Sequence, residues 1–179
     1  AVAVFLPEAN NMEKLVHMPV DGVRLEGMLA VPDKAAGLVL FAHGSGSSRK
    51  SPRNNFVAGE LRKAGLATLL LDLLTPEEDM DYETRFDISL LARRLDGATR
   101  WVGSEAKTKK LKIGYFGAST GAAAALMSAA SAGVDIGAVV SRGGRPDLAM
   151  DSLPFVKSPT LLIVGGEDGP VIEYNRAAY

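Results

Sequence analysis

Ser119 is the residue of this sequence that is best placed to act as a nucleophile. It lies at the centre of Gly117-Ala118-Ser119-Thr120-Gly121, which fits the pattern G-x-S-x-G. In that pattern the serine occupies a sharp turn from a strand into a helix, and the flanking glycines let neighbouring backbone approach closely. The turn exposes the hydroxyl, and the amino end of the helix favours developing negative charge. The motif predicts a nucleophilic serine, and a glycine-eased turn with a helix-capping serine is the alternative.

A glycine- and serine-rich stretch follows an apolar run at residues 37–42. Its sequence is His43-Gly44-Ser45-Gly46-Ser47-Ser48. Acyl transfer needs N–H donors aimed at the developing oxyanion, and a glycine-rich turn such as the one at Gly44 can present them. We predict that the backbone N–H groups of Ser45 and Thr120 form this oxyanion hole. His43 is a candidate general base, but its place before the turn favours a hydrogen bond that organises the loop.

An acidic loop follows another apolar run at residues 160–164. Its sequence is Gly165-Gly166-Glu167-Asp168-Gly169. The acid of a catalytic triad orients the histidine and stabilises its cation. We predict that Asp168 is this acid; its neighbour Glu167 is easily mistaken for it, and an ordinary acidic turn residue is the alternative.

Two arginines, Arg142 and Arg145, follow the apolar run at residues 136–141. The guanidinium group matches the geometry of a carboxylate, so both are candidates for binding a substrate carboxylate. A solvated turn is an equally open interpretation.

The stretch at residues 44–51 also comes close to the phosphate-binding pattern G-x-x-x-x-G-K-[ST]. Arg49 stands where that pattern requires its second glycine, and its side chain would obstruct the tight phosphate-cradling turn. The dinucleotide pattern G-x-G-x-x-G fails at the same place. A nucleotide-binding protein is therefore the weaker hypothesis.

Alternating strands and helices must position these loops. Strands are predicted at residues 12–20, 23–31, 37–42, 66–74, 112–116, 136–141 and 160–164, and helices at residues 52–64, 86–103, 119–132 and 147–150. The first two strands are joined at Asp21-Gly22, a common hairpin turn pair, and residues 75–83 form an acidic surface loop. The pattern predicts an α/β fold: a mostly parallel sheet with an antiparallel N-terminal hairpin and helices on both faces. Ligands bind such sheets at the carboxyl ends of the strands, where the serine, oxyanion and acid loops fall.

The composition narrows the classes of function. The 179 residues fit one domain, 1–179, and 47% of them are hydrophobic. A formal net charge of −1 gives no reason to expect nucleic acid or a membrane as partner. There is no cysteine and only two histidines, His17 and His43, so we expect no thiolate nucleophile, metal or cofactor. We expect a cytoplasmic protein with a small-molecule substrate; a homo-oligomer stays open.

Four segments carry a more specific resemblance. They are Phe41-Ala42-His43-Gly44-Ser45-Gly46-Ser47-Ser48-Arg49 with Ser51-Pro52-Arg53-Asn54 close behind, Gly117-Ala118-Ser119-Thr120-Gly121, Ser141-Arg142-Gly143-Gly144-Arg145-Pro146-Asp147-Leu148, and Val164-Gly165-Gly166-Glu167-Asp168. In this order they resemble the dienelactone-hydrolase-like branch of the α/β-hydrolase superfamily. The resemblance implies a Ser-His-Asp hydrolase with Ser119 as nucleophile and Asp168 as acid. Dienelactone hydrolases proper carry a cysteine nucleophile, so a small carboxylic ester is a better substrate expectation than dienelactone.

The triad histidine is missing from its family position after the acid, because the sequence ends at Tyr179. Three interpretations are open: a chain incomplete at its C-terminus, a relative that has lost the base and only binds, or a substitution by His43. The first predicts that residues beyond Tyr179, or a second copy of the chain, cover the strand at residues 160–164. That strand would otherwise be an exposed apolar edge.

Overall fold

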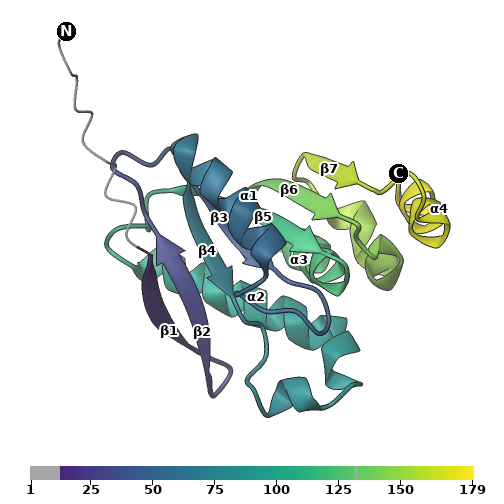
Figure 1. Ribbon diagram of the computed structural model, residues 1–179, viewed down its shortest axis with the longest axis horizontal. Coiled ribbons are helices and arrows are strands. Elements are labelled where there is room, and N and C mark those ends of the chain that lie inside the picture. Colours follow the sequence, from purple (N-terminus) through teal and green to yellow (C-terminus); the bar gives the residue numbers. More distant parts are fainter. Residues whose placement is uncertain (1–12, 132) are drawn as a thin grey trace, which may run out of the picture.

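The computed structural model describes residues 13–131 and 133–179. Over this part of the chain the strands form one sheet in the order β1-β2-β4-β3-β5-β6-β7 (Figure 1). The strands are β1 (Lys14–Val20), β2 (Val23–Ala30), β3 (Gly37–Ala42), β4 (Ala67–Leu71), β5 (Lys112–Ala118), β6 (Ile136–Arg142) and β7 (Thr160–Ile163). The helices are α1 (Pro52–Lys63), α2 (Ile88–Ser104), α3 (Thr120–Ala130) and α4 (Gly169–Ala178), with 3-10 segments η1 (Glu78–Met80), η2 (Thr84–Phe86) and η3 (Pro146–Phe155).

The predicted antiparallel start of the sheet is confirmed. β1 pairs antiparallel with β2, and β2 pairs antiparallel with β4. Asp21 and Gly22 both have positive φ, 49° and 76°, as a two-residue hairpin turn of the favoured hand requires. From β4 through β3, β5 and β6 to β7 every pairing is parallel, so the carboxyl ends of these strands share one edge.

Helices cover both faces of the sheet, as the alternation predicts. α1 lies on one face and α2 and α3 lie on the other (Figure 1). Under α1, Phe41 and Phe116 pack with their ring centroids 5.0 Å apart, against Leu70 and Ala58. The strand residues that alternate with these, including Leu40, Leu69 and Tyr115, belong to the larger core cluster under α2 and α3. Strands buried on both faces read as continuous apolar runs, which is why β3 and β4 are recognisable in the sequence.

The ends of α1 and α2 are set by local chemistry. The Asp87 side chain accepts a 2.9 Å hydrogen bond from Leu90 N–H and so caps α2. Ser51 caps α1 in the same way through Asn54 N–H, and Pro52 occupies the first turn. The α1 helix begins directly after the serine-rich loop, so its cap also fixes the end of that loop.

Several predicted boundaries change. β4 ends at Leu71 rather than at residue 74, because Asp72 turns out of the sheet while Leu73 stays fully buried. The 3-10 segment η1 lies within the acidic loop, and the short helix expected at residues 147–150 extends as η3 from Pro146 to Phe155. α3 begins at Thr120 and ends at Ala130, and position 132, where the prediction ended, lies outside the described residues, as does Met12.

The predicted strand at residues 160–164 forms as β7, but it is not buried on both faces as an apolar run suggests; it is the exposed apolar edge expected when nothing covers it. Within the described residues β7 pairs only with β6, at the end of the sheet, and Leu161 and Ile163 are 56% and 45% exposed. An apolar run shows that a strand can be buried but does not show which element covers it. Among the described residues, no helix is long and apolar enough to cross a membrane.

Candidate active site

Ser119 lies in a strained turn between β5 and α3. Its backbone has φ 52° and ψ −124°, its side chain is exposed, and α3 begins at the next residue. A positive φ at a residue other than glycine costs of order 1–3 kcal/mol, which the surrounding structure must offset. The turn therefore presents the Ser119 hydroxyl at the carboxyl edge of the sheet, beside the amino end of a helix.

Close backbone packing explains the two glycines of the motif. A Cβ at Gly121 would lie 2.2 Å from Ala42 O and 2.4 Å from His43 O. A Cβ at Gly117 would lie 2.4 Å from Ala122 Cα. The first turn of α3 thus packs directly on the end of β3 at Gly121 and on the end of β5 at Gly117, which leaves no room for a side chain at either position.

The His43–Ser48 stretch packs on the turn at Ser119 between β5 and α3, which we name the nucleophile turn after the role predicted for this serine. A Cβ at Gly44 would lie 2.8 Å from Ser119 Cβ and 3.5 Å from Ser119 Oγ. Ser45 N–H donates a 2.9 Å hydrogen bond to Thr120 Oγ1. The two predicted oxyanion-hole residues are therefore neighbours, but the Ser45 N–H already has a side-chain acceptor, which the sequence did not reveal. The first N–H groups of a helix lack intrahelical acceptors, so Thr120 N–H points out of the amino end of α3.

His43 is buried and both of its ring nitrogens have partners. Nδ1 lies 2.9 Å from Gly44 O, and Nε2 accepts from Leu73 N–H at 3.4 Å. Because a carbonyl only accepts and an N–H only donates, Nδ1 carries the proton and the Nε2 lone pair is taken. Asp72 Oδ1 lies 3.8 Å from Nε2. His43 is 8% exposed, and its hydrogen bond to Leu73 joins its loop to the segment that follows β4.

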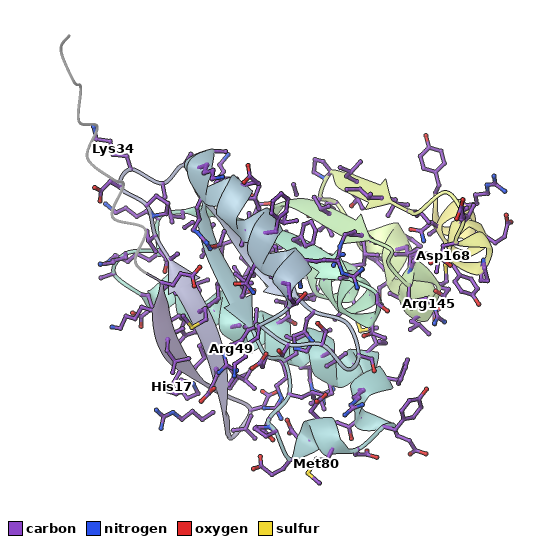
Figure 2. The ribbon with its side chains drawn as sticks, viewed as in Figure 1. His17, Lys34, Arg49, Met80, Arg145 and Asp168 are labelled. Carbon is purple, nitrogen blue, oxygen red and sulfur yellow. The ribbon has the colours of Figure 1, made fainter. Side chains whose placement is uncertain are left out.

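Arg49 anchors the other end of the loop (Figure 2). Its Nη1 pairs with the Asp72 carboxylate, its backbone N–H donates to Asp72 Oδ1 at 2.6 Å, and Nη2 pairs with Glu26 Oε2 at 2.6 Å. A cavity of about 280 Å³ lies alongside and includes His43 and Ser48 in its lining. Since two carboxylates neutralise the guanidinium, the loop does not have the open glycine turn of a phosphate cradle. The sequence singled out Arg49 but not its partners, which come from β2 and from the residue after β4.

Arg142 ends β6 beside the nucleophile turn, since its register partner on β5 is Ala118. Its Nη2 donates to Asn54 Oδ1 at 2.9 Å, and its guanidinium lies 5.8 Å from the centroid of the Phe116 ring. Burial, together with the neighbouring Arg53 cation, lowers the pKa of Arg142. Within the described residues neither Arg142 nor Arg53 forms an ion pair with a carboxylate.

Arg145 is already paired. Its Nε and Nη2 bind both oxygens of Asp147 at 2.8 and 2.7 Å, and its guanidinium lies 4.7 Å from the centroid of the Tyr174 ring on α4. The hydrogen bonds to Asp147 raise the pKa of Arg145. Its backbone N–H donates to Ser119 O at 3.2 Å. Arg145 thus braces the nucleophile turn and α4, and of the two arginines only Arg142 keeps a guanidinium without a carboxylate.

Asp168 lies after β7, at the start of α4 (Figure 2). It is exposed, and its carboxylate makes no hydrogen bond within the described part of the chain. Its backbone closes a turn with Gly165 O at 3.1 Å and accepts from Ile172 N–H at 2.9 Å. Ser119 and Asp168 follow β5 and β7, and Arg142 is the last residue of β6 between them, whereas His17 lies on β1 at the opposite end of the sheet. The structure therefore brings the predicted nucleophile and oxyanion residues together but places no histidine between Ser119 and Asp168.

The fold and the strand–serine–helix turn define the class: this is an α/β-hydrolase-fold protein. No family model matches the chain. The crystal structure of a dienelactone hydrolase from Anabaena variabilis is 60% identical, with a TM-score of 0.89, over 93% of this chain and 79% of that one. The chain belongs to the dienelactone-hydrolase-like branch of the α/β-hydrolase superfamily.

Further relatives extend the comparison. Est1E from Butyrivibrio proteoclasticus shares the fold at 13% identity, with a TM-score of 0.76 over 92% of this chain and 84% of that one. Two Mycobacterium tuberculosis proteins, each named "putative phosphoribosyl transferase", are 59% identical over 163 residues, which is 91% of this chain. The chain spans 37% of the length of these curated relatives.

Proposed function

We propose that the protein is a serine hydrolase that cleaves small carboxylic esters, with Ser119 as the nucleophile. The observation that carries the proposal is the conformation of Ser119: φ 52° with an exposed hydroxyl, at the junction of β5 and α3. Strained backbone of this kind lowers stability, so it persists mainly where the function requires it, and it clusters at functional sites. The 60% identity to a dienelactone hydrolase supports the same chemistry.

The proposed reaction has two halves. Ser119 Oγ bonds to the ester carbonyl carbon while a base takes the hydroxyl proton, and the oxyanion accepts hydrogen bonds from Thr120 and Ser45 N–H. The carbon–oxygen bond to the alcohol then breaks, and the alcohol leaves with the proton held by the base. Water attacks the acyl-enzyme in the same way, which frees the acid and restores Ser119.

We propose that Asp168 is the acid of the triad. The mechanism then needs a histidine that reaches both Ser119 and Asp168. His43 has both nitrogens occupied, and His17 lies on β1. We therefore propose that the base is neither of these histidines and that the whole protein supplies it from outside residues 1–179.

Arg142 suggests which esters are preferred. Its guanidinium lies one strand from the nucleophile turn, near Arg53, and among the described residues no carboxylate forms an ion pair with either arginine. We propose that it binds a carboxylate on the substrate, since the guanidinium fork matches that group. Arg145 is not assigned this role, because Asp147 occupies its fork.

A fluorophosphonate probe tests the assignment in the whole protein. We expect labelling of Ser119 and turnover of an activated ester, with a lower KM for an ester that carries a carboxylate than for a neutral one. Ser119→Ala should abolish both labelling and turnover. Ser104→Ala removes a hydroxyl at the end of α2 whose one hydrogen bond among the described residues goes to Trp101 O, and it should change neither. Labelling that survives Ser119→Ala would refute the proposal.

A catalytically silent binding protein is the second candidate, and the placement of the two histidines favours it. Complete absence of turnover in the whole protein, with Ser119 intact, would support this candidate. The loop at residues 44–51 gives no such support for phosphate or nucleotide binding, because Asp72 and Glu26 hold the Arg49 side chain.

A further inference from the structure

The two groups proposed to hold the oxyanion are linked to each other in the resting structure. Ser45 N–H donates to Thr120 Oγ1 at 2.9 Å, across 75 positions of sequence. Ser45 belongs to the loop after β3 and Thr120 is the first residue of α3, so the bond joins the two backbone segments on either side of Ser119. The contact of Gly44 with Ser119 Cβ brings the same two segments together.

The bond depends on the Thr120 side chain. Any residue except proline would supply a backbone N–H at position 120, but serine and threonine are the residues that carry a hydroxyl acceptor directly on Cβ. Thr120 is 1% exposed, so the packing around it holds its side chain in place. Within the described residues the Thr120 hydroxyl forms no other hydrogen bond. A β-branched side chain also has few rotamers, which keeps the acceptor in place.

We infer that the Thr120 side chain is a positioning residue of the oxyanion hole, which holds the Ser45 N–H beside Ser119 until charge develops. The inference rests on the proposed function. In the resting state the N–H has a neutral acceptor, and in the transition state a charged oxyanion competes for it through a shared, three-centre hydrogen bond. Hydrogen bonds to a charged acceptor are about twice as strong as neutral ones, so the sharing shifts toward the oxyanion as the reaction proceeds. The hydrogen bond from the Ser45 N–H to the oxyanion is stronger in the transition state than in the bound substrate, and it therefore raises kcat.

Three substitutions at one position separate the hydroxyl from the rest of the residue. Thr120→Val keeps the shape of the side chain and removes the acceptor, whereas Thr120→Ser keeps the acceptor. Thr120→Ala removes both the acceptor and the branched shape. Thr68→Val is the matched control: Thr68 is fully buried, accepts from Arg62 Nη1 at 3.2 Å, and lies near the amino end of β4, whereas Ser119 lies at the carboxyl edge of the sheet. All four are made in the whole protein, and the thermal unfolding midpoint identifies any variant that fails to fold.

The first measurement is hydrogen exchange of the Ser45 amide by NMR, which needs no catalysis. We expect exchange about tenfold faster or more in Thr120→Val and Thr120→Ala, and unchanged in Thr120→Ser and Thr68→Val. Equal exchange in Thr120→Val and Thr120→Ser would overturn the inference.

The second measurement is turnover of an activated ester. Complete loss of an oxyanion donor lowers kcat by about 10²–10³, so we expect a loosened donor to lower it about tenfold, with KM unchanged. Thr120→Ser should restore kcat. Faster exchange in Thr120→Val with an unchanged kcat would overturn the catalytic part of the inference. If the unmodified protein shows no turnover at all, the proposed function fails and the role in catalysis fails with it, while the exchange result still decides whether Thr120 holds the loop.

Discussion

Two loops at the same edge of the sheet are held in opposite ways. The loop at residues 43–51 is bonded through side chains of α3, β2 and the residue after β4. The loop at residues 165–169 is exposed, and its hydrogen bonds are those of the backbone turn that leads into α4. The difference shows that the loops proposed to supply the nucleophile and the oxyanion donors are joined by side-chain contacts, whereas the loop that carries the proposed acid is held, within the described residues, only by its backbone.

The same contrast extends to the packing beneath each loop. The strand that leads into the first loop, β3, is almost entirely buried between two covered faces, while Leu161 and Ile163 of β7 are exposed. Rigid positioning matters for donors and nucleophiles, because the electrostatic benefit of an oxyanion hole depends on groups that need no reorganisation during the reaction.

The largest expected effect on stability comes from a methyl group at Gly121. A Cβ there meets two backbone oxygens at 2.2 and 2.4 Å, which cannot move without shifting β3 or α3. We expect Gly121→Ala to cost about 3 kcal/mol or more of unfolding free energy, measured by urea denaturation. Gly166→Ala, in the other loop, has nothing within 4 Å of its Cβ and should stay within about 0.5 kcal/mol. Equal losses would contradict the contrast between the loops.

An intermediate effect is expected from Arg49→Ala. The substitution leaves the largely buried Asp72 carboxylate and the Glu26 carboxylate without their cation. Breaking a fully buried pair costs about 3–5 kcal/mol, and the partial exposure of this one lowers our expectation to about 2 kcal/mol.

The matched control is Arg176→Ala on α4, which removes a pair with Glu173 whose side chains are 73% and 67% exposed. It should cost less than about 0.5 kcal/mol. A loss as small as this in Arg49→Ala would show that the loop at residues 43–51 does not depend on its charged anchor.

The smallest effect on stability is expected from Asp168→Asn, because its carboxylate makes no hydrogen bond within the described residues. The unfolding free energy should change by less than about 0.5 kcal/mol. If Asp168 orients the triad histidine, ester turnover by the whole protein should nevertheless fall by about 10⁴. Glu167→Gln is the control next to it and should leave turnover unchanged. The reverse pattern, with turnover lost only in Glu167→Gln, would move the acid to Glu167.

Much of the fold could be predicted from the sequence because burial leaves a readable pattern. The apolar run at residues 37–42 became β3 with the same bounds, and Asp21-Gly22 formed the hairpin turn. The order of motifs along the chain also indicated the family, since each motif is a short loop sequence at the end of a strand and can be recognised without knowing the tertiary structure. Boundaries were less predictable: Leu73 remains buried after its strand ends, so hydrophobicity alone extended β4 too far.

The sequence by itself determined the class of fold and singled out Ser119, because a glycine–serine–glycine turn between a strand and a helix has few other uses. Only the tertiary structure decided which polar groups are already paired. It showed that the Asp147 carboxylate binds the Arg145 guanidinium and that Leu73 and Gly44 bind the two ring nitrogens of His43. It also showed that the Thr120 hydroxyl accepts a hydrogen bond from the Ser45 N–H. These partners come from strands and loops far apart in the chain, and hydrogen bonding depends on distances and directions that residue types and spacing do not specify.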